Sequence, residues 1–113
     1  MQKKQIVLLN VFDVEPESSE ALLTVLRELT EAVQTEPSFV SATFHVSLDQ
    51  KKVFNYAIYQ GIGTADDIRQ EVIAALMKPE HQKYMQDCLA LAKGNQRTFA
   101  VKAFSATNDA ITV

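Results

Sequence analysis

Hydrophobic and polar residues alternate along two runs, residues 39–48 and 53–60, on either side of the polar segment 49–52. A period of two is typical of β-strands with two different faces, and a connection of four residues suits a hairpin. One predicted face is almost entirely apolar and consists of Val40, Ala42, Phe44, Val46 and Leu48 together with Phe54, Tyr56 and Ile58. The other is mixed.

Residues 5–14 also alternate and predict an earlier strand. A helix is expected to start near Pro16, because proline is tolerated in a first helical turn, and an apolar stripe at helical spacing follows it. Pro37 should end this helix near Glu36, since the residue before a proline is disfavoured in helical conformation.

The second half of the chain predicts two further helices and a strand. Thr64 and the carboxylate of Asp67, three residues later, are typical of a helix N-terminus. Residues 80–92 predict another helix, with Gly94-Asn95 as its C-terminal stop, and residues 97–105 predict the last strand. The order is that of an α+β, ferredoxin-like split β-α-β fold: a four-stranded antiparallel sheet with helices on one face.

Helices on one face leave the other face of such a sheet uncovered. The apolar hairpin face is too large to stay exposed on a monomer, so we expect it to pack against the sheet of a second copy. The predicted homodimer contact is formed by Phe44, Val46, Phe54, Tyr56 and Ile58. The mixed face would then point toward the helices of its own chain.

Polar groups on the mixed face predict a cavity beneath the helices. Each buried polar group needs a hydrogen-bond partner, and space for water or a ligand would supply one. The candidate catalytic residues are His45, Asn55 and Tyr59, and the candidate pocket residues are Asn10, Ser41, Thr43 and His81. Two alternative interpretations need no cavity. A β-bulge shifts the register by one residue, or these polar groups form hydrogen bonds with one another.

The side chains of directly opposed residues share a face, so the register decides which residues meet. Pairing His45 with Asn55 and Ser41 with Tyr59 satisfies this condition for a turn over residues 48–52. We therefore predict that His45 and Asn55 are direct cross-strand neighbours.

The length predicts a single domain over residues 1–113, with a core over 5–105 and a tail over 106–113. The net charge of −3 and the scattered basic residues argue against nucleic-acid binding. Cys88 is the only cysteine, which excludes an intrachain disulfide and fits the reducing cytoplasm. No apolar run is long enough for a membrane span, and the two histidines lack metal-ligand spacing, so neither a membrane nor a metal is expected.

Several segments resemble the antibiotic-biosynthesis monooxygenase (ABM) domain, a dimeric α/β barrel family. They are residues 6–12, the helix start at Pro16, residues 36–40 in the place of the usual QPGF, and Asn55-Tyr56-Ala57 in the place of NYAxW. The resemblance covers about residues 5–105 and implies a ferredoxin-like homodimer.

The resemblance also implies an activity. The best-studied branch oxidises anthrone-type phenols to quinones with O₂ and without a metal, flavin or haem, and a histidine, an asparagine and a tryptophan line its pocket. His45, Asn55 and Tyr59 have that spacing, with tyrosine in the place of tryptophan, while Ala65 and Pro79 stand where that branch has a tyrosine and an arginine. His45 would accept a proton, and Asn55 and Tyr59 would stabilise the substrate anion. The chain is thus expected to be a cofactor-independent monooxygenase of a phenolic or enolic small molecule.

Three alternatives remain open at the level of the sequence. Haem-degrading relatives use an asparagine on the first strand and a histidine late in the second helical region, which Asn10 and His81 match loosely, although the chain has no tryptophan. An isomerase of a signal metabolite is another enzymatic alternative. A non-catalytic small-molecule-binding dimer of the same fold is the last.

Overall fold

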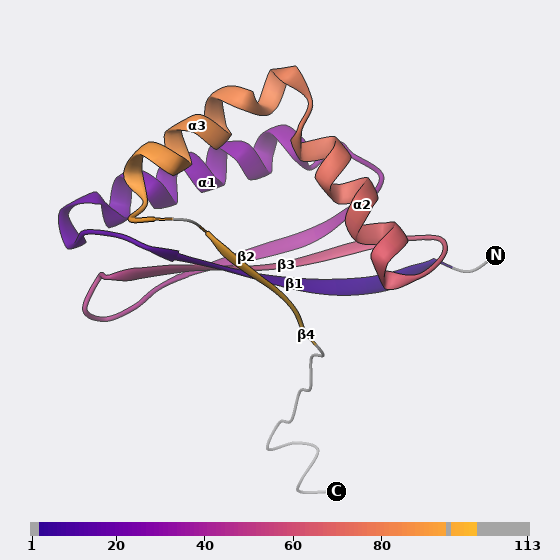
Figure 1. Cartoon of the computed structure of the whole chain (residues 1–113), viewed down its shortest axis with the longest axis horizontal. Helices are drawn as coiled ribbons and strands as arrows, with labels where there is room; N and C mark the ends of the chain where they lie inside the picture. The colour runs from indigo at the N-terminus through magenta and orange to yellow at the C-terminus, as the bar shows by residue number, and fades with distance from the viewer. Residues whose placement is uncertain (1–2, 95, 102–113) are drawn as a thin grey trace, which may run out of the picture.

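The protein is built on one four-stranded antiparallel sheet with the strand order β2-β3-β1-β4 (Figure 1). The computed structural model describes residues 3–94 and 96–101. The strands are β1 (Lys4–Asp13), β2 (Phe39–Val46), β3 (Lys52–Gly61) and β4 (Arg97–Val101). The predicted extension of β4 to residue 105, the tail over 106–113 and the stop at Asn95 lie outside the described residues.

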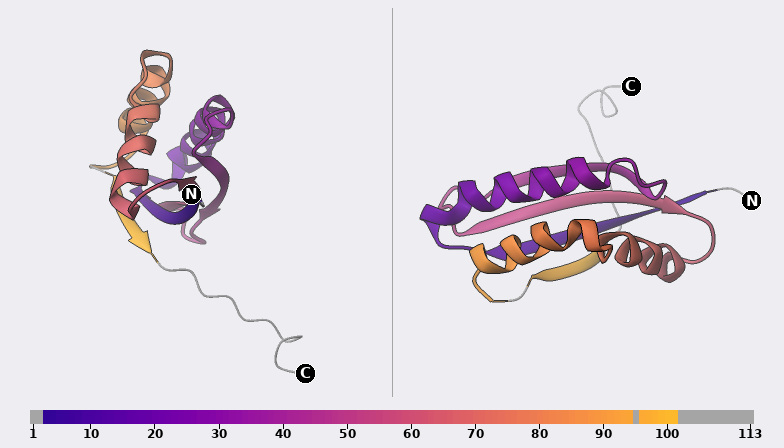
Figure 2. Two further views of the ribbon diagram at one scale, coloured as in Figure 1. Left: turned by 90° about the vertical axis from the view of Figure 1, so that its right-hand side faces the viewer. Right: turned by 90° about the horizontal axis from the view of Figure 1, so that it is seen from above.

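The helices all lie on one face of this sheet (Figures 1 and 2). They are the short 3-10 helix η1 (Pro16–Ser18), α1 (Ser19–Val33), α2 (Ala65–Leu76), the 3-10 helix η2 (Pro79–His81) and α3 (Gln82–Leu91). α1 and α3 run side by side, and α2 covers the end of the sheet near the N-terminus of β1 (Figure 2). The predicted ferredoxin-like α+β fold is therefore confirmed.

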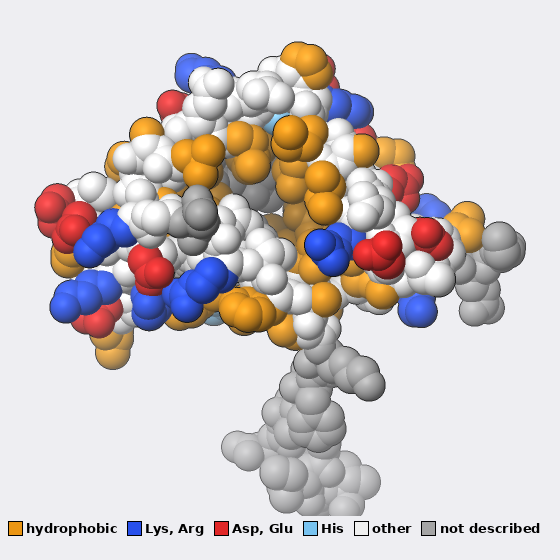
Figure 3. Space-filling view, in the orientation of Figure 1, with side chains coloured by type: hydrophobic (Ala, Val, Ile, Leu, Met, Phe, Trp, Pro, Cys, Tyr) orange, Lys and Arg blue, Asp and Glu red, His pale blue; other side chains and the backbone are white. Residues whose placement is uncertain are grey.

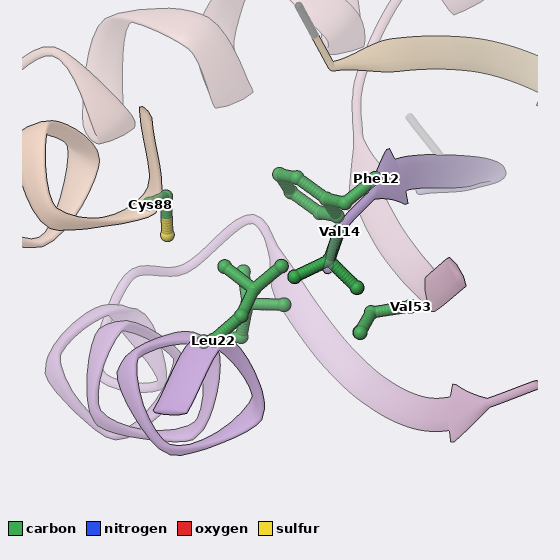
Figure 4. Packing of buried hydrophobic residues seen from close by; sticks show 6 residues of the cluster. Phe12, Val14, Leu22, Val53 and Cys88 are labelled. Carbon is green, nitrogen blue, oxygen red and sulfur yellow. The ribbon is translucent and has the colours of Figure 1, made fainter. Parts of the chain in front are cut away.

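The packing between helices and sheet forms two buried clusters. The first joins Leu22 of α1 to Phe12 and Val14 of the first strand region and to Val53 of β3, with Cys88 of α3 beside them (Figure 4). The second packs Ile68 and Val72 of α2 against Leu8, Ala57 and Tyr59 of the sheet. Burying each large side chain contributes about 1.5–3 kcal/mol. The space between the two clusters is left for a cavity.

A capping box starts α2, as the sequence predicts. The Thr64 hydroxyl accepts a hydrogen bond from the Asp67 backbone N–H at 3.1 Å, and the Asp67 carboxylate accepts one from the Thr64 N–H at 2.9 Å. Gly63 precedes the box with φ of +107°, and a Cβ there would lie 2.6 Å from the Asp67 carboxylate. Glycine is therefore required where the chain turns into α2.

Thr64→Ala should lower the free energy of unfolding by about 1 kcal/mol, because it removes the acceptor for one N–H of the helix start. Hydrogen bonds from Thr64 lower the pKa of Asp67. The contribution of that carboxylate is therefore complete above the ordinary aspartate pKa of about 3.9 and is lost as the pH falls through the lowered value. Urea denaturation at neutral and acidic pH measures both effects. Thr24→Ala on the exposed face of α1 is the control, and an equal loss there would contradict the capping role.

The pairing of β2 with β3 differs from the predicted register by one residue. Phe44 lies opposite Asn55, and His45 lies opposite Phe54. The cause is a β-bulge: Phe39 pairs with Tyr59 but Ser41 pairs with Ile58, so Val40 is an extra residue. The prediction that His45 and Asn55 are direct cross-strand neighbours is therefore wrong.

The bulge reverses the two faces of β2 for the residues that follow it. Ala42, Phe44 and Val46 turn toward the helices, and Phe44 and Val46 pack against the cluster that contains Leu22. The prediction that these two side chains form the dimer contact is wrong, because they already belong to the core of their own chain. A one-residue change of register moves every side chain of a strand to the other face.

The uncovered side of the sheet remains strongly apolar in spite of this change. We call this side the open face. Its apolar residues are Val7, Leu9 and Val11 of β1, Phe54, Tyr56 and Ile58 of β3, and Phe99 and Val101 of β4. Ser41, Thr43 and His45 of β2 extend this face with polar side chains. No helix within the described residues covers it (Figure 1).

Candidate functional site

A cavity of about 350 Å³ lies between the sheet and the helices. Its walls are mostly apolar, and its lining residues are Leu8, Asn10, Phe12, Leu26, Leu29, Thr30, Val33, Phe39, Ala42, Asn55, Tyr59, Arg69, Val72, Ile73, Leu76, Met77, Met85, Cys88, Leu89, Ala92, Gln96 and Thr98. Ile73, Met77 and Leu89 are 41–61% exposed, so apolar side chains form a rim that is open to solvent. Figure 3 shows hydrophobic side chains around a hollow on this side of the molecule. The cavity can hold a small, largely apolar ligand.

Asn10 on β1 is the centre of a polar cluster at one side of the cavity. Its side-chain oxygen accepts hydrogen bonds from the Thr98 hydroxyl at 2.8 Å and from the Gln96 amide at 2.8 Å. Gln96 also donates to the Thr98 hydroxyl at 2.9 Å. Asn10 and Thr98 are direct neighbours across β1 and β4, so strand pairing places this cluster.

Asn55 on β3 lies directly opposite Asn10 of β1. Its Oδ1 is buried and has no hydrogen-bond partner. A buried acceptor without a partner costs about 1–3 kcal/mol, so the free protein bears a cost that a suitable ligand would remove. The amides of Asn10 and Asn55 together form the polar floor of an otherwise apolar cavity.

Tyr59 lies four residues after Asn55 on the same face of β3 and is 8% exposed. The ring of Phe39 packs edge-on against it, with ring centres 6.3 Å apart. Burial raises the pKa of the Tyr59 hydroxyl above its usual value. The hydroxyl therefore stays protonated at neutral pH and is available as a hydrogen-bond donor.

Two further lining residues complete the chemistry of the cavity. Arg69 on α2 brings a positive charge to the rim, and its side chain is 54% exposed. Its Nη1 lies 3.8 Å from Oδ1 of Asp66. Burial, assisted by the charge of Asp87, raises the pKa of the Cys88 thiol to about 11. Cys88 is thus a neutral packing residue at physiological pH and not an activated nucleophile.

The structure places four of the predicted site residues outside this cavity. His45, Ser41 and Thr43 are exposed residues of β2 on the open face, because the bulge at Val40 turns them away from the helices. His45 is therefore unsuited to accept a proton from a ligand in the cavity, and the predicted pocket positions of Ser41 and Thr43 are wrong.

His81 at the corner between α2 and α3 is also absent from the cavity lining. The ring is 3% exposed, and its Nδ1 lies 2.8 Å from the Ala75 carbonyl oxygen. This contact ties η2 to the last turn of α2. The pocket prediction for His81 is wrong, and its position is that of a structural residue.

The sequence prediction missed the polar residues in and just before β4 and the charge on α2. Gln96 and Thr98 have no motif of their own, and only the pairing of β4 with β1 brings them to Asn10. Arg69 could have been found by its position, since it follows Ile68 on the helix that covers the pocket. Asn10, Asn55 and Tyr59, which the sequence singled out, do line the cavity.

Residues 3–94 and 96–101 contain no group of three or more His, Cys, Asp or Glu residues placed to hold a metal ion. In the same residues, no helix combines the length and the apolar character that crossing a membrane requires.

Comparison with solved structures defines the class of the fold: it is that of the antibiotic biosynthesis monooxygenases. A putative antibiotic biosynthesis monooxygenase from Nitrosomonas europaea superposes with a TM-score of 0.72 at 15% sequence identity, over 95% of this chain and 97% of the other. SnoaB, a cofactor-independent oxygenase from Streptomyces nogalater, superposes with a TM-score of 0.63 at 20% identity, over 88% of this chain and 95% of the other. No family model matches the sequence.

A curated relative adds sequence similarity to this likeness of fold. The chain is 49% identical over 51 residues to tetracenomycin-F1 monooxygenase of Streptomyces glaucescens. The match covers 44% of this chain and 46% of that protein, so the chain matches less than half of the length of the relative. The resemblance to the ABM domain is confirmed by these comparisons.

Proposed function

We propose that the protein is a cofactor-independent monooxygenase that oxidises a phenolic or enolic small molecule with O₂. The observation that carries this proposal is the apolar cavity whose floor holds the paired amides of Asn10 and Asn55. The sequence similarity to a tetracenomycin-F1 monooxygenase and the fold of SnoaB support it.

The proposed reaction needs only O₂ as the oxidant. An anthrone-type substrate loses a proton from its methylene carbon, and the negative charge moves to its carbonyl oxygen as an enolate. This electron-rich anion reduces O₂ and forms a carbon–oxygen bond, which gives a hydroperoxide after protonation. The hydroperoxide loses water and leaves a new carbonyl group. One O₂ is consumed, one of its oxygen atoms enters the product and the other leaves as water.

The cavity suits the anionic step of this reaction. Amide N–H groups and the Tyr59 hydroxyl can donate hydrogen bonds to the enolate oxygen, and such donors are stronger where water is excluded. Arg69 adds a positive charge at the rim. The described lining includes no histidine, aspartate or glutamate, so the proton passes to water or hydroxide at the open rim.

The rate should therefore rise with pH between about pH 6 and pH 9 without a bell-shaped maximum. The pKa of Cys88 is about 11 and that of Tyr59 is raised, so neither group loses its proton in this range. Stopped-flow rates at saturating substrate, corrected for the uncatalysed oxidation at each pH, measure the profile. A maximum near neutral pH would show that an enzyme base takes the proton and would contradict this route.

We also propose that two copies pack through their open faces and that the protein works in the cytoplasm. Support for the dimer comes from the apolar row on β1, β3 and β4, which no helix of the described residues covers (Figure 1). Tyr56, Phe54 and Ile58 keep the positions on this face that the sequence analysis gave them. A reducing compartment suits the single buried thiol of Cys88.

The proposed activity is tested with dithranol, a hydroxyanthrone whose methylene carbon can be oxidised to a quinone carbonyl. Purified protein treated with a chelator should consume one O₂ for each quinone formed, faster than a protein-free blank. Isotopically labelled O₂ should place one labelled atom in the product. Activity that vanishes with chelation and returns with a metal, or label that comes from water, would contradict the proposal.

A further inference from the structure

We infer that Gln96, just before β4, and Thr98 of β4 are positioning residues that fix the orientation of the Asn10 amide in the cavity. The inference rests on the proposed function for its kinetic consequence, but its structural part stands on the hydrogen bonds alone. The two groups of an asparagine amide differ in chemistry, since the oxygen only accepts and the nitrogen only donates. Whichever group faces a ligand decides what the ligand must offer.

In the structure, the side chains of Gln96 and Thr98 hold one orientation of this amide. Asn10 Oδ1 receives hydrogen bonds from the Gln96 amide and the Thr98 hydroxyl, both at 2.8 Å. While Gln96 keeps this orientation, reversing the Asn10 amide would bring the Asn10 nitrogen to the Gln96 nitrogen at the same distance, and two donors would face each other. Because the amide is planar, fixing Oδ1 toward β4 directs Nδ2 away from β4.

This orientation gives the cavity floor a donor beside Asn55. Asn10 is 9% exposed and lies directly opposite Asn55, whose Oδ1 is buried without a partner. In the proposed reaction, the nitrogen of Asn10 donates to the enolate oxygen from the cavity floor. A donor fixed before the reaction stabilises the developing charge without the cost of turning during the reaction. Gln96 and Thr98 touch no reacting atom in this account and act through Asn10.

The double variant Gln96→Ala/Thr98→Val removes both donors to Asn10 Oδ1 and keeps a β-branched side chain on β4. It should lower kcat for dithranol by about tenfold, with KM changed less than about twofold, because the lost donor acts mainly on the developing anion. Gln96→Ala/Thr98→Ser, which retains a hydroxyl, should recover most of the activity. Thr24→Val on the exposed face of α1 is the matched control and should leave kcat unchanged.

A double-mutant cycle with Asn10→Ala separates positioning from a general structural effect. On the Asn10→Ala background, the substitutions Gln96→Ala and Thr98→Val should cause almost no further loss of kcat. An equal tenfold loss on that background would overturn the inference, as would a rise in KM with kcat unchanged.

A second readout does not depend on turnover. In the protein without ligand, the side-chain NH₂ resonances of Asn10 should shift in the ¹⁵N spectrum of Gln96→Ala/Thr98→Val, because the amide loses both hydrogen-bond donors. In Gln96→Ala/Thr98→Ser they should return toward their wild-type positions. Unchanged Asn10 resonances would overturn the inference even if dithranol is oxidised. If the wild-type protein does not oxidise dithranol but these resonances shift as expected, the proposed function fails and the positioning of Asn10 stands.

Discussion

Tyr56→Asp is expected to turn a dimer into a monomer. Tyr56 lies in the middle of the open face, directly opposite Leu9 on β1 and Thr43 on β2. In the proposed dimer its ring is buried against the partner sheet, and a carboxylate there would be desolvated without a partner. Burying an unpaired charge costs several kcal/mol, which corresponds to a dissociation constant weaker by about 10² to 10³-fold.

Sedimentation velocity from nanomolar to micromolar concentration measures this change. Gln86→Asp, on the exposed side of α3, adds the same charge away from the open face and should leave the dimer intact. A wild-type protein that sediments as a monomer at micromolar concentration would refute the dimer. A Tyr56→Asp variant that remains dimeric would show that the contact uses another surface.

Asn55→Ala is expected to lower kcat/KM for dithranol by about 10²-fold, the low end for removal of one donor from an oxyanion site. Asn55 lies on the cavity floor, and its amide is placed beside that of Asn10. The variant also removes a buried oxygen that has no partner. We therefore expect little loss of folding stability, because the substitution deletes an unsatisfied group together with the side chain.

Initial rates of O₂ uptake and urea denaturation on the same preparation measure the two halves of this prediction. Gln70→Ala, an amide truncation on the exposed side of α2, is the control for both. Normal kinetics in Asn55→Ala would remove the amide from the mechanism. A large loss of stability would mean that the activity change reports unfolding and not chemistry.

The sequence predicts the layers of this fold well because periodicity is a local property. Alternation over residues 53–60 places Val53, Ala57 and Tyr59 on the helix-facing side, where they are buried. The start of α2 is equally local, since the side chains of Thr64 and Asp67 each accept a hydrogen bond from the backbone N–H of the other. Such features depend only on neighbours within a few residues along the chain.

The register of β2 could not be predicted in the same way. Val40 is β-branched and apolar, like a regular strand residue, and nothing in residues 39–46 marks it as the bulge. A single extra residue there moved His45 from the expected pocket to the open face. Asn55 and Tyr59 kept their places because β3 runs without a bulge against β1.

Long-range contacts are the other part of the site that could not be predicted from the sequence. The hydrogen bonds of Asn10 come from residues 86 and 88 positions further along the chain. Thr98 in isolation is an ordinary strand residue, and Gln96 an ordinary loop residue. Their role follows only once β4 is paired beside β1 at the edge of the sheet.

The central claim is that the reaction takes place in the cavity beneath the helices and not at the histidine of β2. The most direct measurement compares kcat/KM for dithranol in two variants, as the ratio of the His45→Ala value to the Asn55→Ala value. Both variants are assayed at concentrations where the same fraction of the protein is dimeric. Because His45 lies on the open face and Asn55 on the cavity floor, the ratio should be about 50 or more. A ratio near one, or an inactive His45→Ala beside an active Asn55→Ala, would contradict the account.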